Sequence, residues 1–146
     1  MLLGLLNSSL SDWYFRLGST NAHVNHYQLY NLPAPPFDNE KTDNKNLAAQ
    51  FADALGQKDF DACFSVIEPL TVQSPFPQAV SSCLKMLVER IIEIETNRGE
   101  IARTDRSELA VEAQPIQTLI DRILFRLAGL TDAEAEGLEQ RLSKML

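Results

Sequence analysis

Apolar side chains recur at helical spacing over most of the chain after residue 46. Intervals of three and four residues place them on one face of a helix, so the pattern predicts helices over about 47–56, 59–67, 76–97, 115–128 and 131–146. The segment 76–97 is the longest and should be the backbone of the core. Its inward positions are predicted to be Val80, Cys83, Leu84, Leu87, Val88, Ile91, Ile92 and Ile94.

Residues that favour helix ends stand at the limits of these segments. Gly56 and Gly129 are placed to follow the last turns of two helices, and Pro115 stands in the first turn of another. Thr131 and Glu134 fit a capping box, in which each side chain bonds the backbone amide of the other residue. Because no strand alternation or internal repeat competes, residues 44–146 are all predicted to belong to a helical bundle.

The first seventeen residues are predicted to form a helix that is buried on most sides. Their apolar positions cover too wide an arc for one exposed stripe: they are Leu2, Leu3, Leu5, Leu6, Leu10, Trp13, Phe15 and Leu17. Residues 18–21 end this helix, and a short segment after it stops at Pro33. The rigid stretch 33–37 and the polar residues that follow it form a connector.

The predicted fold class is all-α or mostly α, a helical bundle of about five to six helices with a short irregular Pro-rich segment near the N-terminus. We expect residues 1–37 to be a terminal segment, 38–46 a linker and 47–146 a C-terminal helical bundle. With 146 residues, 45% of them hydrophobic, the chain is long enough for one modest core.

Charge restricts the class of partner. The formal net charge is −7 and the pI is near 4.8. This balance argues against a free-standing nucleic-acid binder, because sequence-independent affinity comes from Lys and Arg that neutralise phosphates. Any contact with DNA should therefore be local, or be made by a partner.

Two further features bear on location. Cys63 and Cys83 lie in apolar helical patterns without CxxC or Cys/His spacing, which predicts buried free thiols in a reduced, cytoplasmic protein. Residues 1–6 lack the basic start of a signal peptide, and no apolar run reaches the roughly 18 residues needed to cross a bilayer. We expect no membrane association.

Two stretches resemble the C-terminal part of a known enzyme family. Residues 2–10, the aromatic cluster 13–15 and the segment 27–37 follow the order "LLxLLNSxLxxWYF" and "LxxLPxPxF". This order resembles the closing stretch of the target-recognition domain in adenine-specific DNA methyltransferases and fused type II restriction-modification enzymes. Residues 120–134 resemble the tail "IDxLVYxLYGLTxEE" of many such enzymes, with departures at Leu124–Leu127 and at Ala128 that keep the apolar character but remove a tyrosine hydroxyl.

The resemblance implies a C-terminal part of a longer enzyme, in which residues 1–37 end the target-recognition domain. The family transfers a methyl group from S-adenosylmethionine to the amino group of adenine. That chemistry needs a glycine-rich cofactor loop and an Asn/Asp-Pro-Pro-aromatic motif that holds the flipped base. The sequence contains neither motif. We therefore expect no catalytic residues and no cofactor in this chain, and S-adenosylmethionine only in the parent enzyme.

Polar residues between the first helix and the Pro-rich segment are the candidates for DNA contact. Arg and Asn side chains give bidentate readout of guanine and adenine, and the resemblance puts this loop on the side of the domain where DNA passes. The candidates are Arg16, Asn21, His23, Asn25 and His26.

No metal site is predicted. His23 and His26 have an HxxH spacing, but no Cys lies nearby and a third zinc ligand would have to be Asp12 or a distant carboxylate, so they are expected to be polar loop residues. The tripeptide 43–45, Asp-Asn-Lys, has the form of half a nuclease site, yet it lies in a polar connector without a strand pair or a preceding acid.

The leading hypothesis is thus a non-catalytic part of a restriction-modification methyltransferase that supports the target-recognition domain. Its expected partners are the remainder of the parent enzyme and, through the parent, DNA. The rival hypothesis is a self-contained helical protein–protein interaction module that docks through the apolar helix 2–17, with a second copy of the chain as one expected partner.

Overall fold

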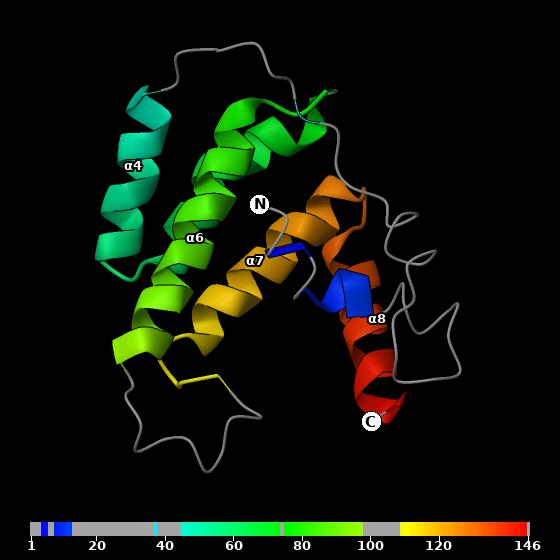
Figure 1. Ribbon diagram of the computed structural model, residues 1–146. Coiled ribbons are helices and arrows are strands. Elements are labelled where there is room, and N and C mark those ends of the chain that lie inside the picture. Colours follow the sequence, from blue (N-terminus) through cyan, green and yellow to red (C-terminus); the bar gives the residue numbers. More distant parts are fainter. Residues whose placement is uncertain are drawn as a thin grey trace, which may run out of the picture.

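The computed structural model describes residues 4–5, 8–12, 37, 45–73, 75–97 and 109–145. Over these residues it confirms the all-α class, because they form five α-helices and one 3₁₀ helix and no strand. The elements are α4 (Lys45–Gly56), α5 (Phe60–Ile67), η1 (Glu68–Val72), α6 (Gln78–Asn97), α7 (Gln114–Leu127) and α8 (Asp132–Met145) (Figure 1).

Helix α7 lies at the centre of the bundle. It contacts α5, η1, α6 and α8, while α4 packs on α5 and α6. Figure 1 shows α6 and α7 side by side, with α4 beyond α6 and α8 beyond α7. The predicted inward face of α7 is confirmed by the burial of Ile116, Leu119, Ile120, Ile123, Leu124 and Leu127. Phe125 is buried on another side, where it packs with Leu138 and Leu142 of α8 in a second, smaller cluster.

The helix ends follow the predicted chemistry at most positions. Glu134 Oε2 accepts a hydrogen bond from the Thr131 amide at 2.8 Å, and Thr131 Oγ1 accepts one from the Glu134 amide at 3.3 Å, which confirms the capping box. Gly129 has φ +81°, as expected for a glycine that follows a helix. Pro115 stands in the first turn of α7, where its missing N–H leaves no hydrogen bond unmade.

The C-cap predicted at Gly56 is wrong in detail. Gly56 is the last residue of α4, and the left-handed conformation falls two residues later on Lys58, with φ 58°. The Lys58 amide bonds the Leu55 carbonyl at 3.1 Å, and the Asp59 amide bonds the Ala54 carbonyl at 3.0 Å. These bonds satisfy the last carbonyls of α4 without a glycine.

Two helix starts also differ slightly from the prediction. Helix α4 begins at Lys45 instead of residue 47, and α6 begins at Gln78 instead of Phe76. Pro77 explains the second difference, because a residue that precedes a proline is biased away from helical geometry. The Pro77 carbonyl then accepts the Val80 amide at 3.0 Å and begins the helix.

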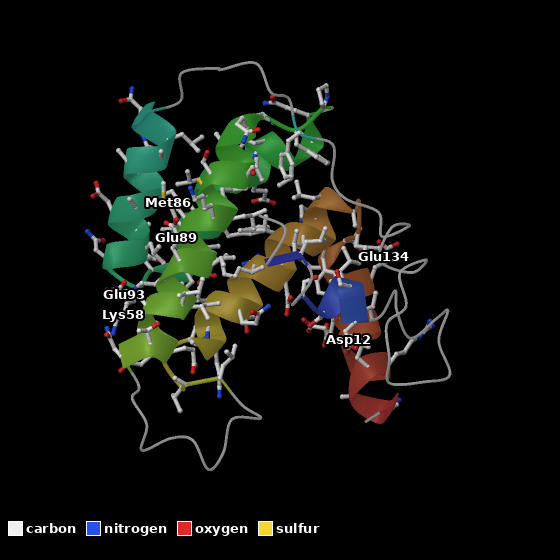
Figure 2. All side chains as sticks on the ribbon, viewed as in Figure 1. Asp12, Lys58, Met86, Glu89, Glu93 and Glu134 are labelled. Carbon is white, nitrogen blue, oxygen red and sulfur yellow. The ribbon has the colours of Figure 1, made fainter. Side chains whose placement is uncertain are left out.

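Ile92 is not buried as the spacing predicted. Its side chain is 48% exposed, while Val80, Cys83, Leu84 and Leu87 are buried. The apolar arc in the second half of α6 is too wide for its neighbours to cover completely. The other side of α6 is a solvated charged face, as expected: Glu89 and Glu93 are exposed (Figure 2) and pair with nearby Lys85 and Arg90 at 3.8 and 2.7 Å.

The described part of the N-terminal segment lies within the helical bundle. Leu5 is 1% exposed and belongs to the main core, and Leu10 packs against both core clusters. Burial of Gly4, Leu5, Ser8 and Ser11 agrees with the expected burial of the first helix. In Figure 1 the described part of this segment, in blue, crosses in front of α7 and extends toward α8. Residues 13–17 lie outside the described residues, and the division of the chain at residues 38–46 stays a prediction.

Among the helices that the structure describes, none is long and apolar enough to cross a membrane.

The close approach of Gly4 to α6 gives a test of the fold. A Cβ at position 4 would lie 2.9 Å from Val88 Cγ2, and the β-branched Val88 has little freedom to move aside in a helix. We expect Gly4→Ala to lower the free energy of unfolding by about 1–3 kcal/mol, as measured by urea denaturation. Gly137→Ala is the matched control in α8, where nothing lies within 4 Å of the new Cβ. It should raise stability by about 0.5–1 kcal/mol, and equal effects of the two changes would contradict the close approach.

Candidate functional site

Asp121 of α7 is a buried carboxylate at the point where the N-terminal segment meets the bundle. The residue is only 7% exposed. The Ser9 amide donates to Oδ1 at 2.9 Å, and the Ser9 hydroxyl donates to Oδ2 at 2.8 Å. Gln117 Nε2, one turn earlier in α7, donates to Oδ1 at 3.2 Å. None of the ion pairs between described residues includes Asp121. Among these residues, neutral hydrogen-bond donors therefore replace the water that its carboxylate would otherwise bind.

Buried serines hold Ser9 in position for these bonds. The Ser8 hydroxyl donates to the Leu5 carbonyl at 2.6 Å and accepts the Ser11 amide at 3.2 Å. The Ser11 hydroxyl also donates to the Leu5 carbonyl. Ser8 thus caps the turn 9–12 in the way that a helix N-cap does, which leaves the Ser9 amide free to bond Asp121. Every fully buried side-chain polar atom in the described part of the chain has a hydrogen-bond partner.

Burial raises the pKa of the Asp121 carboxyl above its ordinary value, and the hydrogen bonds from Ser9 and Gln117 act in the opposite direction. Glu139 of α8 lies close enough to Asp121 for its own pKa to be affected. Burial raises its pKa first, and the negative charges of Asp121 and Glu136 raise it further. Although these carboxylates are near one another, no group of His, Cys, Asp or Glu among the described residues is arranged to hold a metal ion.

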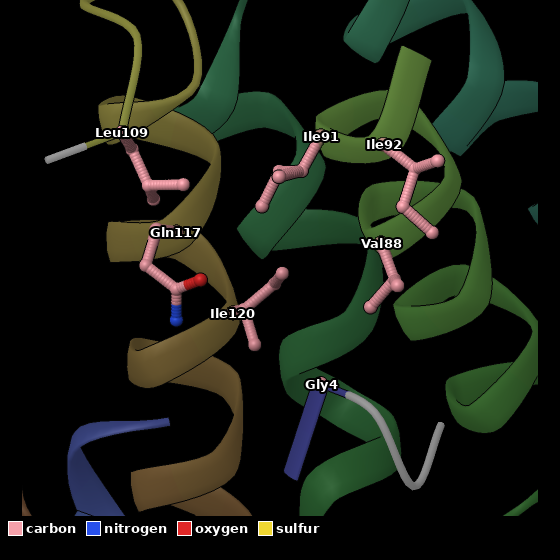
Figure 3. A pocket seen from close by; sticks show the side chains of 7 residues that line it. All are labelled: Gly4, Val88, Ile91, Ile92, Leu109, Gln117 and Ile120. Atoms are coloured by element: carbon pink, nitrogen blue, oxygen red, sulfur yellow. The ribbon is translucent and has the colours of Figure 1, made fainter. Parts of the chain in front are cut away.

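An apolar pocket of about 340 Å³ lies beside this junction (Figure 3). Helix α6 supplies one wall and α7 the other, with Gly4 between them. The lining residues are Gly4, Val88, Ile91, Ile92, Leu109, Gln117 and Ile120. Gln117 is the only polar side chain among them, and its amide nitrogen also bonds Asp121. The pocket can accommodate an apolar group, and its lining offers no nucleophile, acid or base.

The arginines of the tail motif, Arg122 and Arg126, pair with carboxylates and an aromatic ring of the same chain. Arg122 Cζ lies 3.8 Å from the centre of the Phe64 ring, and its guanidinium is 3.6 Å from Asp61. Arg126 pairs with Asp132 at 2.9 Å and approaches Glu68 at 3.9 Å. These contacts join α7 to α5, η1 and α8.

The residues predicted to contact DNA all lie outside the described residues. These are Arg16, Asn21, His23, Asn25 and His26, and their role stays a prediction. Ser9 and Asp121 were not among the site residues predicted from the sequence. A signal was present, because Asp121 falls between the apolar face that includes Ile120 and Leu124 and the side that carries Phe125, and an acid in such a place needs a partner when it is buried. What the sequence does not show is which donor reaches it.

Neither a protein-family model, nor a curated protein, nor a solved structure matches the chain.

The buried carboxylate predicts how stability depends on pH. Because the folded pKa of Asp121 is raised above the ordinary value of 3.8, the folded chain holds this proton to higher pH than the unfolded chain. Its contribution is fully present below that ordinary value and is lost as pH rises through the folded pKa. Asp121→Asn keeps an acceptor for Ser9 but cannot ionise. We expect the unfolding free energy of the unmodified chain to fall relative to this variant as pH rises from acid to neutral.

Chemical denaturation at a series of pH values measures this difference. Glu139→Gln should be present in both proteins, because burial and charge shift the pKa of Glu139 in the same direction. Asp121→Ala is the second comparison, since it leaves the Ser9 donors without their acceptor and should lower stability by about 1–3 kcal/mol. If the unfolding free energy of the unmodified chain instead rises relative to that of Asp121→Asn as pH increases, the burial of the charge is contradicted.

The buried cysteines give an independent prediction. Both are free and buried, as expected from the sequence. Burial raises the pKa of Cys63 to about 11 and that of Cys83 to about 12, so almost no thiolate is present near neutral pH. We expect neither thiol to react with a disulfide reagent at pH 8 in the folded chain, and both to react in denaturant. A thiol that reacts rapidly without denaturant would contradict the burial of Cys63 in α5 and of Cys83 in α6.

Proposed function

We propose that the chain is the C-terminal part of a type II restriction-modification enzyme or a related adenine-specific DNA methyltransferase. In this proposal it is non-catalytic, and its helical bundle supports the end of the target-recognition domain. Its partners are the remainder of the parent enzyme and, through the parent, DNA. A restriction-modification enzyme acts on DNA inside the cell, so the proposal includes a cytoplasmic location.

The contact between Ser9 and Asp121 is the observation that carries the proposal. Ser9 belongs to the first stretch that resembles the family, and Asp121 belongs to the second. The two residues are 112 positions apart, yet both carboxylate oxygens of Asp121 accept hydrogen bonds from Ser9. If the two stretches resembled the family by chance, nothing would require them to satisfy each other's buried polar groups. Their contact supports the proposal that the two stretches belong to one unit of packing in the parent enzyme.

A second contact supports the same view. Phe37 stands at the end of the "LxxLPxPxF" stretch and forms an isolated parallel bridge with Phe76, immediately before α6. The two rings lie 6.2 Å apart with an angle of 56° between their planes. This separation and tilt are typical of a favourable aromatic pair. Phe37 of the first resembling stretch thus contacts the bundle, as Ser9 does.

The non-catalytic assignment rests on the chemistry of the residues. Pro35, Pro36 and Phe37 come near the base-binding motif of the family, but Ala34 stands where that motif needs Asn or Asp to bond the adenine amino group. The Phe37 ring, moreover, packs on Phe76. In the proposal, methyl transfer and the binding of S-adenosylmethionine belong to the parent enzyme.

The rival proposal, an interaction module that docks through helix 2–17, needs the apolar side of that helix to be available to a partner. Leu5 is 1% exposed in the chain's own core, and Gly4 lies against Val88 of α6. A partner or a second copy could use these residues only if they left the bundle. The first proposal needs no such rearrangement and is favoured for that reason.

The genomic test of the proposal is direct. The reading frame or gene immediately upstream should encode a glycine-rich cofactor loop and an Asn-Pro-Pro-Tyr-type motif. Coexpression of that product with this chain should give methyl transfer to adenine in duplex DNA, whereas this chain alone should give none. An upstream region without either motif would sink the proposal.

DNA binding supplies a prediction for the chain itself. With a net charge of −7, it should bind duplex DNA only weakly, and the affinity should fall steeply with salt. Arg16→Ala should reduce the slope of log affinity against log salt by about one. Arg141→Ala, on the exposed side of α8, removes the same charge and should leave the slope unchanged. Fluorescence anisotropy at several salt concentrations measures both. Tight binding at physiological salt, or equal effects of the two variants, would contradict this assignment.

A further inference from the structure

Two contacts with the bundle flank residues 13–36. On the N-terminal side, Ser9 bonds Asp121 of α7 through its amide and its hydroxyl at 2.9 and 2.8 Å. On the C-terminal side, Phe37 pairs with Phe76 through a backbone bridge and through the two rings. The contacts differ in chemistry, because one satisfies a buried carboxylate and the other buries aromatic surface.

The bundle residues of both contacts belong to elements that pack on one another. Helix α6, which begins two residues after Phe76, contacts α7, which carries Asp121. Gly4 lies close to both of these helices, because a Cβ at this position would lie 2.9 Å from Val88 Cγ2 and 3.9 Å from Ile120 Cγ2. The two flanks of residues 13–36 are therefore fixed on one core and not on two independent units.

We propose that Asp121 and Phe76 form a two-point attachment that positions the flanks of residues 13–36 on the helical bundle. Neither residue contacts DNA in this proposal; both are positioning residues. The claim that the positioned segment meets duplex DNA rests on the proposed function above, but the attachment itself does not. It assigns the bundle a specific task, which is to hold a segment of the target-recognition domain at both ends.

A cleavage experiment on the full chain tests the first point of attachment. A protease recognition sequence is inserted between Ser19 and Thr20, and the purified protein is cleaved there. We expect the N-terminal fragment to remain bound to the rest of the chain in size-exclusion chromatography and native mass spectrometry. Ser9→Ala removes one hydrogen bond to the carboxylate and should make the fragment dissociate roughly 10- to 100-fold faster. Asp121→Ala should release it more completely.

Leu119→Ala is the matched control for the cleavage experiment. Leu119 is buried in α7 on nearly the opposite side of the helix from Asp121, because two residues correspond to about 200° of rotation. Its truncation lowers global stability without touching Ser9, so the fragment should dissociate at close to the unmodified rate. If Asp121→Ala does not fold, hydrogen exchange of residues 8–12 in uncleaved Ser9→Ala measures the same contact, and exchange there should rise while that of α4 is unchanged.

Hydrogen exchange also tests the second point. Phe76→Ala should accelerate exchange of the peptide that contains Phe37, whereas Val72→Ala should not, because Val72 is 84% exposed. Immediate loss of the fragment from the cleaved, unmodified chain would overturn the first point of attachment. Equal dissociation in Ser9→Ala and Leu119→Ala would do the same, and unchanged exchange at Phe37 in Phe76→Ala would overturn the second. None of these measurements uses DNA. A chain that keeps its attachment but lacks any DNA-linked activity with its upstream partner would therefore refute the proposed function alone.

Discussion

The buried carboxylate of Asp121 constrains the rest of the structure more than any other single group. A carboxylate in an apolar interior is costly unless donors replace the water that it loses. Gln117 supplies one donor from the same helix, and the other two come from Ser9 at the opposite end of the chain. Undocking the N-terminal segment would therefore expose Leu5 and also leave Asp121 with fewer donors. Packing and polar satisfaction favour the same arrangement.

The position of α7 explains why one residue has this influence. Four elements contact it, so water reaches only part of its surface, for example at Gln114 and Thr118. Phe125 faces α8, and the leucines and isoleucines of the predicted stripe face α5 and α6. Arg122 and Arg126 escape burial at the side toward α5, where their guanidinium groups cover the ring of Phe64. Asp121 falls between these surfaces, on the side where Ser9 of the N-terminal segment covers it.

Local sequence patterns predicted most of the helical bundle because helix formation and helix ends depend on residues close together in the sequence. The capping box at Thr131, the glycine at 129 and the proline at 115 depend on neighbours within a few residues, and the structure has them as expected. Ile92 was predicted to be buried because spacing gives the direction of a side chain around a helix but not how far the neighbouring helix extends over it. Of the candidate site, burial along α7 was predictable, but the bond from Ser9 was not. That bond joins residues 112 apart, and nothing in the local pattern identifies the donor.

The charges of the bundle are consistent with the proposal that it supports the DNA-contacting segment and does not itself bind DNA. Arg122 and Arg126, the cations of the tail motif, are paired with Asp61, Glu68 and Asp132. Arg90 is likewise paired with Glu93. A phosphate that approached these arginines would have to displace a carboxylate that the chain already provides, within a protein of net charge −7. These three arginines are therefore poorly placed to attract DNA. In the proposed function, the bundle would contribute to recognition by limiting the positions that the DNA-contacting residues can take, because contacts made from a fixed geometry lose less conformational entropy on binding.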